Sequence, residues 1–155
     1  MSQTLGRYCA SIAYYEDVYT GDLPVNGSEV ALPTTSDDMP WLATVRKRMN
    51  EIRRLKYNWD GRGSARVPTE TLAFAFSMLT STMPPKAAVP AIVPLGDGGL
   101  QLVWYSPRCD IEVEIAKPNQ VNIYHHDHLT GTEREWDEST DVTRLSDILW
   151  SISRG

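Results

Sequence analysis

The sequence contains few of the residues from which catalytic and metal centres are usually built. Its two cysteines, Cys9 and Cys109, lie too far apart for a CxxC or zinc-ribbon motif. No serine lies in a GxSxG motif, and the glycines of GRG and GDGG lack the strand-to-helix context of a phosphate-binding loop. We therefore expect no cofactor and no enzyme activity of these types.

Long apolar runs are also absent. No stretch approaches the ~18 apolar residues that a membrane span needs. The first residues, MSQTLGRYCASIAYYED, do not form a basic segment followed by an apolar one, as a signal peptide would. We expect a cytoplasmic protein without membrane contact, in which the cysteines stay reduced. A chain of 155 residues is long enough for one domain with its own hydrophobic core.

Charge and aromatic residues are unevenly distributed. The net charge of −5 argues against general nucleic-acid binding. Residues 46–66, however, include eight basic and two acidic side chains, so this segment has a charge of +6 and the remainder −11. Five tryptophans and seven tyrosines outnumber the two phenylalanines. Because Trp and Tyr have both an apolar ring and a polar group, this excess favours a binding function.

Residues 1–38 are predicted to form an acidic, tyrosine-rich arm, and residues 39–155 a single domain. Turn-forming residues at Gly21, Asn26-Gly27 and Pro33 prevent a long helix in the arm. The arm includes Tyr14, Tyr15 and Tyr19. Such a concentration of aromatic side chains indicates contact, either with the domain itself or with a partner.

Periodicity predicts two helices, then strands, then a helix. Apolar residues at helical spacing predict helices over residues 40–56, capped by Asp37 or Asp38, and 68–83, ended by Pro84-Pro85. Alternating residues predict strands over 91–95, 100–105, 110–116, 120–126 and 132–136. A short helix follows, capped by Ser139 or Thr140.

Short connections between the strands require antiparallel pairing. The predicted fold is therefore α+β, in the order ααβββββα. It is a two-layer sandwich in which an antiparallel meander of four to five strands packs on two or three helices. One face of the meander is apolar and the other is polar. The polar face includes Gln101, Tyr105, Glu112, Glu114, Asn122, Tyr124 and His126.

The segment between the two predicted helices contains a distinctive loop, NWDGRGSARVP. With the later turn it provides Asn58, Trp59, Asp60, Gly61, Gly63, Asp97, Gly98 and Gly99. This pattern resembles a family of small, uncharacterised bacterial proteins with an Asn-Trp-Asp-Gly-x-Gly-Ala-like loop followed by a DGG-containing meander. Arg62 and Ser64 stand where an aromatic residue and an alanine are expected. The resemblance spans residues 50–136 and implies a fold and a bacterial or phage setting, but no activity.

All three histidines lie in the segment His125-His126-Asp127-His128. On a strand His126 and His128 share one face, where Glu112 or Glu114 could complete a metal site. A polar turn at the end of a strand explains the same residues more simply. Glu112 and Glu114 also form a candidate acid–base pair, but an open sheet face hydrates both carboxylates, which argues against it.

Residues 46–56 of the first predicted helix form the basic surface of the chain. Arg46, Arg53 and Arg54 could bind phosphates, with Trp59 close by for base stacking. The alternatives are an ordinary solvated helix face, or a surface that binds the acidic arm of the same chain or of a second copy in a homodimer.

Together these features favour a non-catalytic protein-interaction module of bacterial or phage origin, such as an antitoxin-, immunity- or inhibitor-like component. Another protein is the expected partner. The candidate contact residues are Tyr14, Tyr15, Tyr19, Arg46, Arg53, Arg54, Trp59, Glu112, Glu114 and Tyr124. The first alternative is a nucleic-acid-binding adaptor that uses the basic helix 46–56, and the second is a metal-dependent enzyme that uses the His125–His128 cluster.

Overall fold

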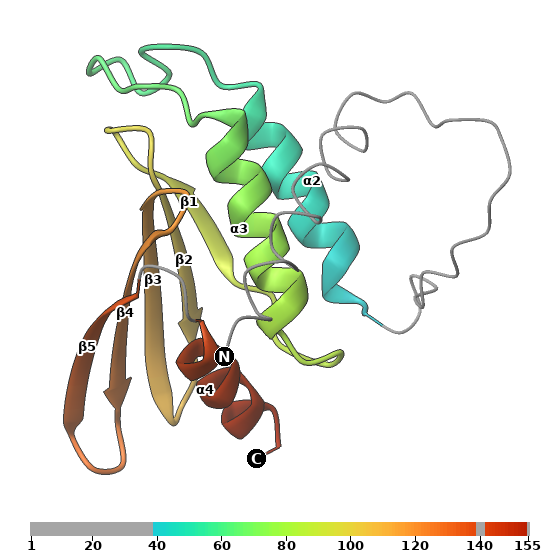
Figure 1. Ribbon diagram of the computed structural model, residues 1–155, viewed down its shortest axis with the longest axis vertical. Helices are drawn as coiled ribbons and strands as arrows, with labels where there is room; N and C mark the ends of the chain where they lie inside the picture. Colours follow the sequence, from blue (N-terminus) through green and yellow to red (C-terminus); the bar gives the residue numbers. More distant parts are fainter. Residues whose placement is uncertain (1–38, 139–141, 155) are drawn as a thin grey trace, which may run out of the picture.

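A computed structural model describes residues 39–138 and 142–154 of the chain. Within these residues three helices and five strands follow one another in the predicted order, which confirms the α+β fold (Figure 1). The helices are α2 (Trp41–Arg53), α3 (Thr69–Thr82) and α4 (Thr143–Ser153). The strands are β1 (Ala91–Pro94), β2 (Leu100–Tyr105), β3 (Cys109–Lys117), β4 (Gln120–Asp127) and β5 (Thr132–Glu138). The predicted arm, with Tyr14, Tyr15 and Tyr19, and the predicted caps Asp37, Asp38, Ser139 and Thr140 lie outside the described residues.

The sheet is a meander in which every strand pairs with its neighbours in the chain. Its strand order is β1-β2-β3-β4-β5, and all four pairings are antiparallel. One irregularity interrupts the β3–β4 ladder: Ile115 pairs with Val121, but Lys117 pairs with Gln120, so a bulge lies between Ile115 and Lys117. This bulge sets which residues of β4 face those of β3.

The helices cover one face of the sheet, which we call the inner face (Figure 1). Leu102, Ile111, Val113 and Ile123 project from the strands into a core shared with the helices. Helix α3 contacts β2, β3, α2 and α4. Every residue from Thr71 to Leu79 is buried, so α3 is enclosed on all sides, whereas the sequence predicted a single apolar stripe.

Helix α2 is fastened at two points by side-chain hydrogen bonds to distant carbonyls. The indole Nε1–H of Trp41 donates to the carbonyl of Pro84 at 3.0 Å, and Nε–H of Arg48 donates to the carbonyl of Ile92 at 3.0 Å. Pro84 follows α3 and Ile92 lies in β1. These bonds hold α2 against both of its neighbours in the fold, α3 and β1.

The loop between α2 and α3 packs against the β1–β2 turn. Ala65 N–H donates to Gly96 O at 2.8 Å, which joins the two segments directly. Within the loop Asn58, Gly61 and Gly63 all adopt positive φ angles, of 63°, 75° and 85°. The glycines and the asparagine of this loop therefore meet a backbone requirement, since few other residues tolerate this conformation.

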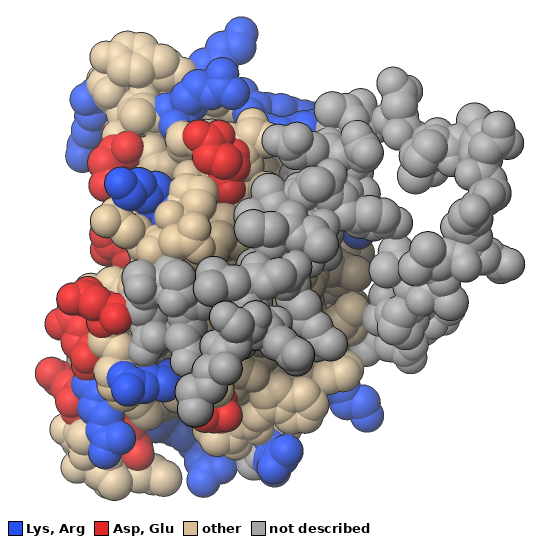
Figure 2. Space-filling view, in the orientation of Figure 1, with Lys and Arg blue, Asp and Glu red and all other residues tan. Residues whose placement is uncertain are grey.

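No helix in the described part of the chain is long and apolar enough to cross a membrane. Figure 2 shows lysine and arginine side chains at the upper end of the molecule, where the loop between α2 and α3 lies in Figure 1, and also along its lower end.

Candidate functional site

The outer face of the sheet, opposite the helices, presents three rows of polar side chains across β2, β3, β4 and β5. The strand register places Gln101, Glu114, Asn122 and Asp137 in the first row. The second row is Val103, Glu112, Tyr124 and Glu135. The third is Tyr105, Asp110, His126 and Glu133. We call these twelve positions the acidic face, because each row has one carboxylate from β3 and one from β5.

The charge of this face is of one sign. Its three rows include six carboxylates and neither lysine nor arginine. Carboxylates in one strand repeat about every 6.8 Å, and the β3 and β5 columns are about 9.6 Å apart. Asn122, Tyr124 and His126 of β4 separate the two columns. Acidic side chains along the left margin of Figure 2, over the sheet, belong to this side of the molecule.

Neutral amides bind several of these carboxylates. Gln101 Nε2 donates to Glu112 Oε2 at 3.0 Å, and Asn122 Nδ2 donates to Glu135 Oε1 at 2.6 Å. Loss of hydration, followed by the carboxylate of Glu133, raises the pKa of Tyr124 above its ordinary value. Since an amide orients a carboxylate without neutralising it, the face keeps its negative charge.

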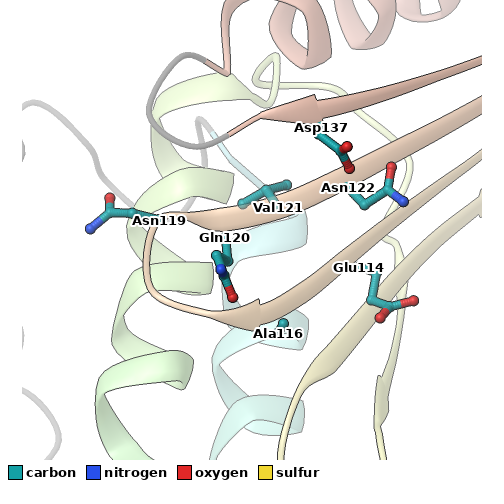
Figure 3. A pocket seen from close by; sticks show the side chains of 7 residues that line it. All are labelled: Glu114, Ala116, Asn119, Gln120, Val121, Asn122 and Asp137. Atoms are coloured by element: carbon teal, nitrogen blue, oxygen red, sulfur yellow. The ribbon is translucent and has the colours of Figure 1, made fainter.

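At one end of the acidic face lies a hollow of about 550 Å³. Glu114, Asn122 and Asp137, from three adjacent strands, point to the same side of the sheet beside it (Figure 3). Oδ1 of Asn122 is buried and has no hydrogen-bond partner in the part of the chain that the structure describes. Every side-chain oxygen of this trio is an acceptor when the two carboxylates are ionised, so the hollow suits a donor group such as an ammonium or a guanidinium.

At the other end Asp110, His126 and His128 meet. His128 Nε2 lies 3.1 Å from Asp110 Oδ2, and the rings of His126 and His128 have their centroids 5.0 Å apart. The hydrogen bond from Asp110 raises the pKa of His128 above its ordinary value. His125 alternates to the inner face, where burial lowers its pKa.

The sequence predicted that Glu112 or Glu114 would lie beside His126 and His128, and the structure corrects this prediction. Glu112 pairs with Tyr124 and Glu114 with Asn122, whereas Asp110 pairs with His126. The acid beside the two imidazoles is Asp110 rather than either glutamate.

The predicted basic surface lies apart from the acidic face. Arg46 is exposed, and its guanidinium lies 5.9 Å from the centre of the Phe76 ring. Arg53 is half-buried and Arg54 is exposed. Trp59 is half-buried, and its Nε1–H donates to Ala65 O at 3.1 Å. Of the candidate contact residues, the structure brings together Glu112, Glu114 and Tyr124, and it places the α2 arginines on a different side.

Four further acids belong to the face. Sequence reasoning missed Asp110, and it identified Glu133, Glu135 and Asp137 only as part of an acidic stretch that could imitate a phosphate backbone, without placing them beside Glu112 and Glu114. The signal for three of them was the alternation TEREWDE in β5, in which every second residue is acidic. Asp110 could have been found only from the β3–β4 register, and predicting that register requires knowledge of the bulge between Ile115 and Lys117.

Comparison with known protein families, with curated proteins and with solved structures gives no match to this chain. The fold class and the geometry of the acidic face are therefore the basis for a functional proposal.

Proposed function

We propose that the protein is a non-catalytic interaction module, antitoxin-, immunity- or inhibitor-like in its mode of action, whose acidic face binds a basic surface of another protein. The single observation behind this proposal is the two columns of carboxylates on β3 and β5, in rows without lysine or arginine. Complementary charge accelerates association and selects among partners. A lysine- and arginine-rich protein surface, such as one that binds nucleic-acid phosphates, is the partner that this pattern fits.

The aromatic side chains of the face support the same proposal. Tyr124 is half-buried between the two acidic columns, and Tyr105 at the margin is 72% exposed. Tyrosine contributes a large contact area at small entropic cost, and it is enriched in protein interfaces.

The test compares two double variants as bait in a nuclease-treated bacterial lysate. Glu112→Gln with Glu135→Gln removes two charges from the acidic face. Glu70→Gln with Asp147→Asn removes two exposed charges from helices α3 and α4. The captured protein is then purified and titrated against each variant.

We expect the partner to be basic, its affinity to fall with rising salt, and only the acidic-face variant to bind it more weakly. Equal binding by both variants would contradict the proposal, as would recovery of nucleic acid without any protein partner.

Nucleic acid is the second candidate partner. It would bind at the end of α2 and the loop between α2 and α3. Tyr57 is 73% exposed there, and Arg54, Lys56 and Arg62 nearby are exposed as well. Cations around an exposed ring are the usual elements of single-strand binding. Changing Arg54 and Lys56 to Glu should abolish retention of a labelled oligonucleotide if this surface is used, and should leave protein capture unchanged.

A further inference from the structure

The cluster of Asp110, His126 and His128 has the composition of a transition-metal site. One ligand atom from each residue lies within 4.8 Å of the other two, and the closest approach is the 3.1 Å between His128 Nε2 and Asp110 Oδ2. Ligands of a tetrahedral zinc ion lie about 3.4 Å apart, given bonds of about 2.1 Å. His126 is only partly buried, so its ring is not locked by surrounding atoms as a core side chain would be.

The backbone holds the three residues next to one another. Asp110 and His126 face each other across the β3–β4 ladder. His128 follows β4, and its backbone N–H donates to Arg108 O at 2.8 Å, which ties it to the start of β3. The turn beyond it is closed by Gly131 N–H, which donates to Asp127 O at 2.8 Å. The ligands are therefore placed by the fold and do not depend on a flexible segment to meet.

A second interaction orients the ring of His128. Its Nδ1 lies 3.3 Å from the carbonyl of Pro107. Since a carbonyl oxygen can only accept, Nδ1 must hold the proton in this contact, and Nε2 is the nitrogen that faces Asp110. Metal-binding histidines usually donate their second ring N–H to a carbonyl or carboxylate in this way, which fixes the tautomer.

The surrounding charge also favours a cation. Glu133 lies opposite His126 on β5, and Glu112 is the next outward residue after Asp110 on β3. Arg134 lies opposite His125 and so belongs to the inner face.

We propose that Asp110, His126 and His128 bind one zinc ion. Two imidazoles and a carboxylate are a ligand set that zinc accepts, and three protein ligands leave the fourth position of the tetrahedron open. That position faces solvent at the edge of the acidic face, where water or a donor from a partner can occupy it. The inference goes beyond the proposed function and does not depend on it.

The test uses the full chain without a polyhistidine tag. Titration calorimetry with zinc chloride is expected to give one site per chain with a Kd below about 100 µM. Cobalt(II) is expected to give the intense visible absorption of four-coordinate cobalt, and zinc should remove it. A heat signal absent up to about 1 mM zinc, or only the weak spectrum of six-coordinate cobalt, would overturn the proposal.

Variants locate the ion. His126→Gln, His128→Gln and Asp110→Asn should each weaken zinc binding about tenfold or more. The matched control is His125→Gln, which removes the one histidine whose ring lies on the inner face, and it should bind zinc as the unchanged chain does. An equal loss in the control would overturn the assignment, and so would full affinity in the His126 and His128 variants. Melting temperatures of all four variants establish that the comparison is made on folded protein.

Discussion

The hydroxyl of Ser64 donates a hydrogen bond of 2.6 Å to Oδ2 of Asp60, four residues earlier in the loop between α2 and α3. The other carboxylate oxygen, Oδ1, accepts from the backbone N–H of Arg62 at 2.9 Å and of Ser64 at 3.3 Å. One aspartate thus closes the loop. Because all three donors favour the ionised form, the Ser64 hydroxyl first and the Arg62 N–H next, the pKa of Asp60 is below its ordinary value.

This loop is expected to lose stability in acid. A carboxyl whose pKa is lowered by folding stabilises the native state above its unfolded pKa, and that contribution disappears as the pH falls through the folded pKa. The loss should therefore begin below about pH 4. Ser64→Ala removes the strongest of the three donors, so its melting temperature should differ from that of the unchanged chain at pH 7 and converge with it in acid. A constant difference down to pH 2.5 would contradict this account.

Gly99 is expected to tolerate no side chain. A Cβ atom at this position would lie 2.8 Å from the backbone oxygen of Ile115 in β3, which cannot move without disturbing the ladder. Gly99→Ala should lower the free energy of unfolding by about 1–3 kcal/mol. Gly96→Ala is the comparison, because its Cβ would meet a side chain, the Ser64 hydroxyl at 3.0 Å, and can be accommodated at no more than the loss of the Ser64–Asp60 hydrogen bond. Denaturant unfolding of both variants should rank Gly99→Ala as the less stable.

Trp41 of α2 and Trp59 of the loop that follows α2 should differ in their effect on stability. Trp41 is 1% exposed and belongs to the core, so Trp41→Ala should cost about 3–5 kcal/mol. Trp59 is half-buried and lies outside that core. Trp59→Ala should cost about 1–2 kcal/mol. Equal losses in chemical denaturation would mean that the indole of Trp59 contributes as much as a core side chain.

The ionisation of Tyr124 should report the charge of the acidic face. Burial and then the charge of Glu133 raise the pKa of this phenol, and Glu112 and Asp110 add to the effect. Glu133→Gln should therefore lower the pKa of Tyr124 in a spectrophotometric titration. Glu114→Gln, in the row on the other side of Tyr124, removes a charge that does not contribute to this shift and should leave the pKa nearly unchanged. A pKa that does not respond to Glu133 would show that burial alone is responsible.

Most of the sheet could be predicted because its residues alternate strictly. Leu100, Leu102 and Trp104 define the inner side of β2, and the predicted bounds of that strand agree with the structure. Strand β5 is different, since its inward residues include Arg134 beside Trp136. Without an apolar stripe the sequence does not say which side of β5 faces the helices, and for this reason the acids of β5 could not be placed on the same face as those of β3.

The position of Asp110 depended on a feature that local sequence does not reveal. Continued without interruption from the pair Lys117–Gln120, the β3–β4 register would place Asp110 opposite Asp127. The bulge after Ile115 shifts the register by one residue and places it opposite His126. The shift is needed so that Ile115 and Val121 both face the core. Which residues face the core depends on the packing of the whole domain and not on the local sequence.

The long-range contacts of α2 were equally hidden. Periodicity predicted which of its residues face the core, but not that Arg48 reaches the carbonyl of Ile92 or that Arg46 lies over Phe76. Long side chains find such partners only after helices pack, so the number of arginines in a helix overstates how many of them are available to bind a partner.

The uninterrupted meander has a consequence for how the chain folds. Each strand needs only a short loop closure to reach its partner, so the sheet can form by successive hairpins with a small loss of chain entropy at each step. Helix α3 leaves the ribosome before any strand and can receive them as they emerge. Helix α4 arrives last, and until Leu145 and Leu149 enter the core the nascent domain exposes part of its apolar interior. Truncation before residue 143 should therefore yield an aggregation-prone intermediate with most of its strands already paired.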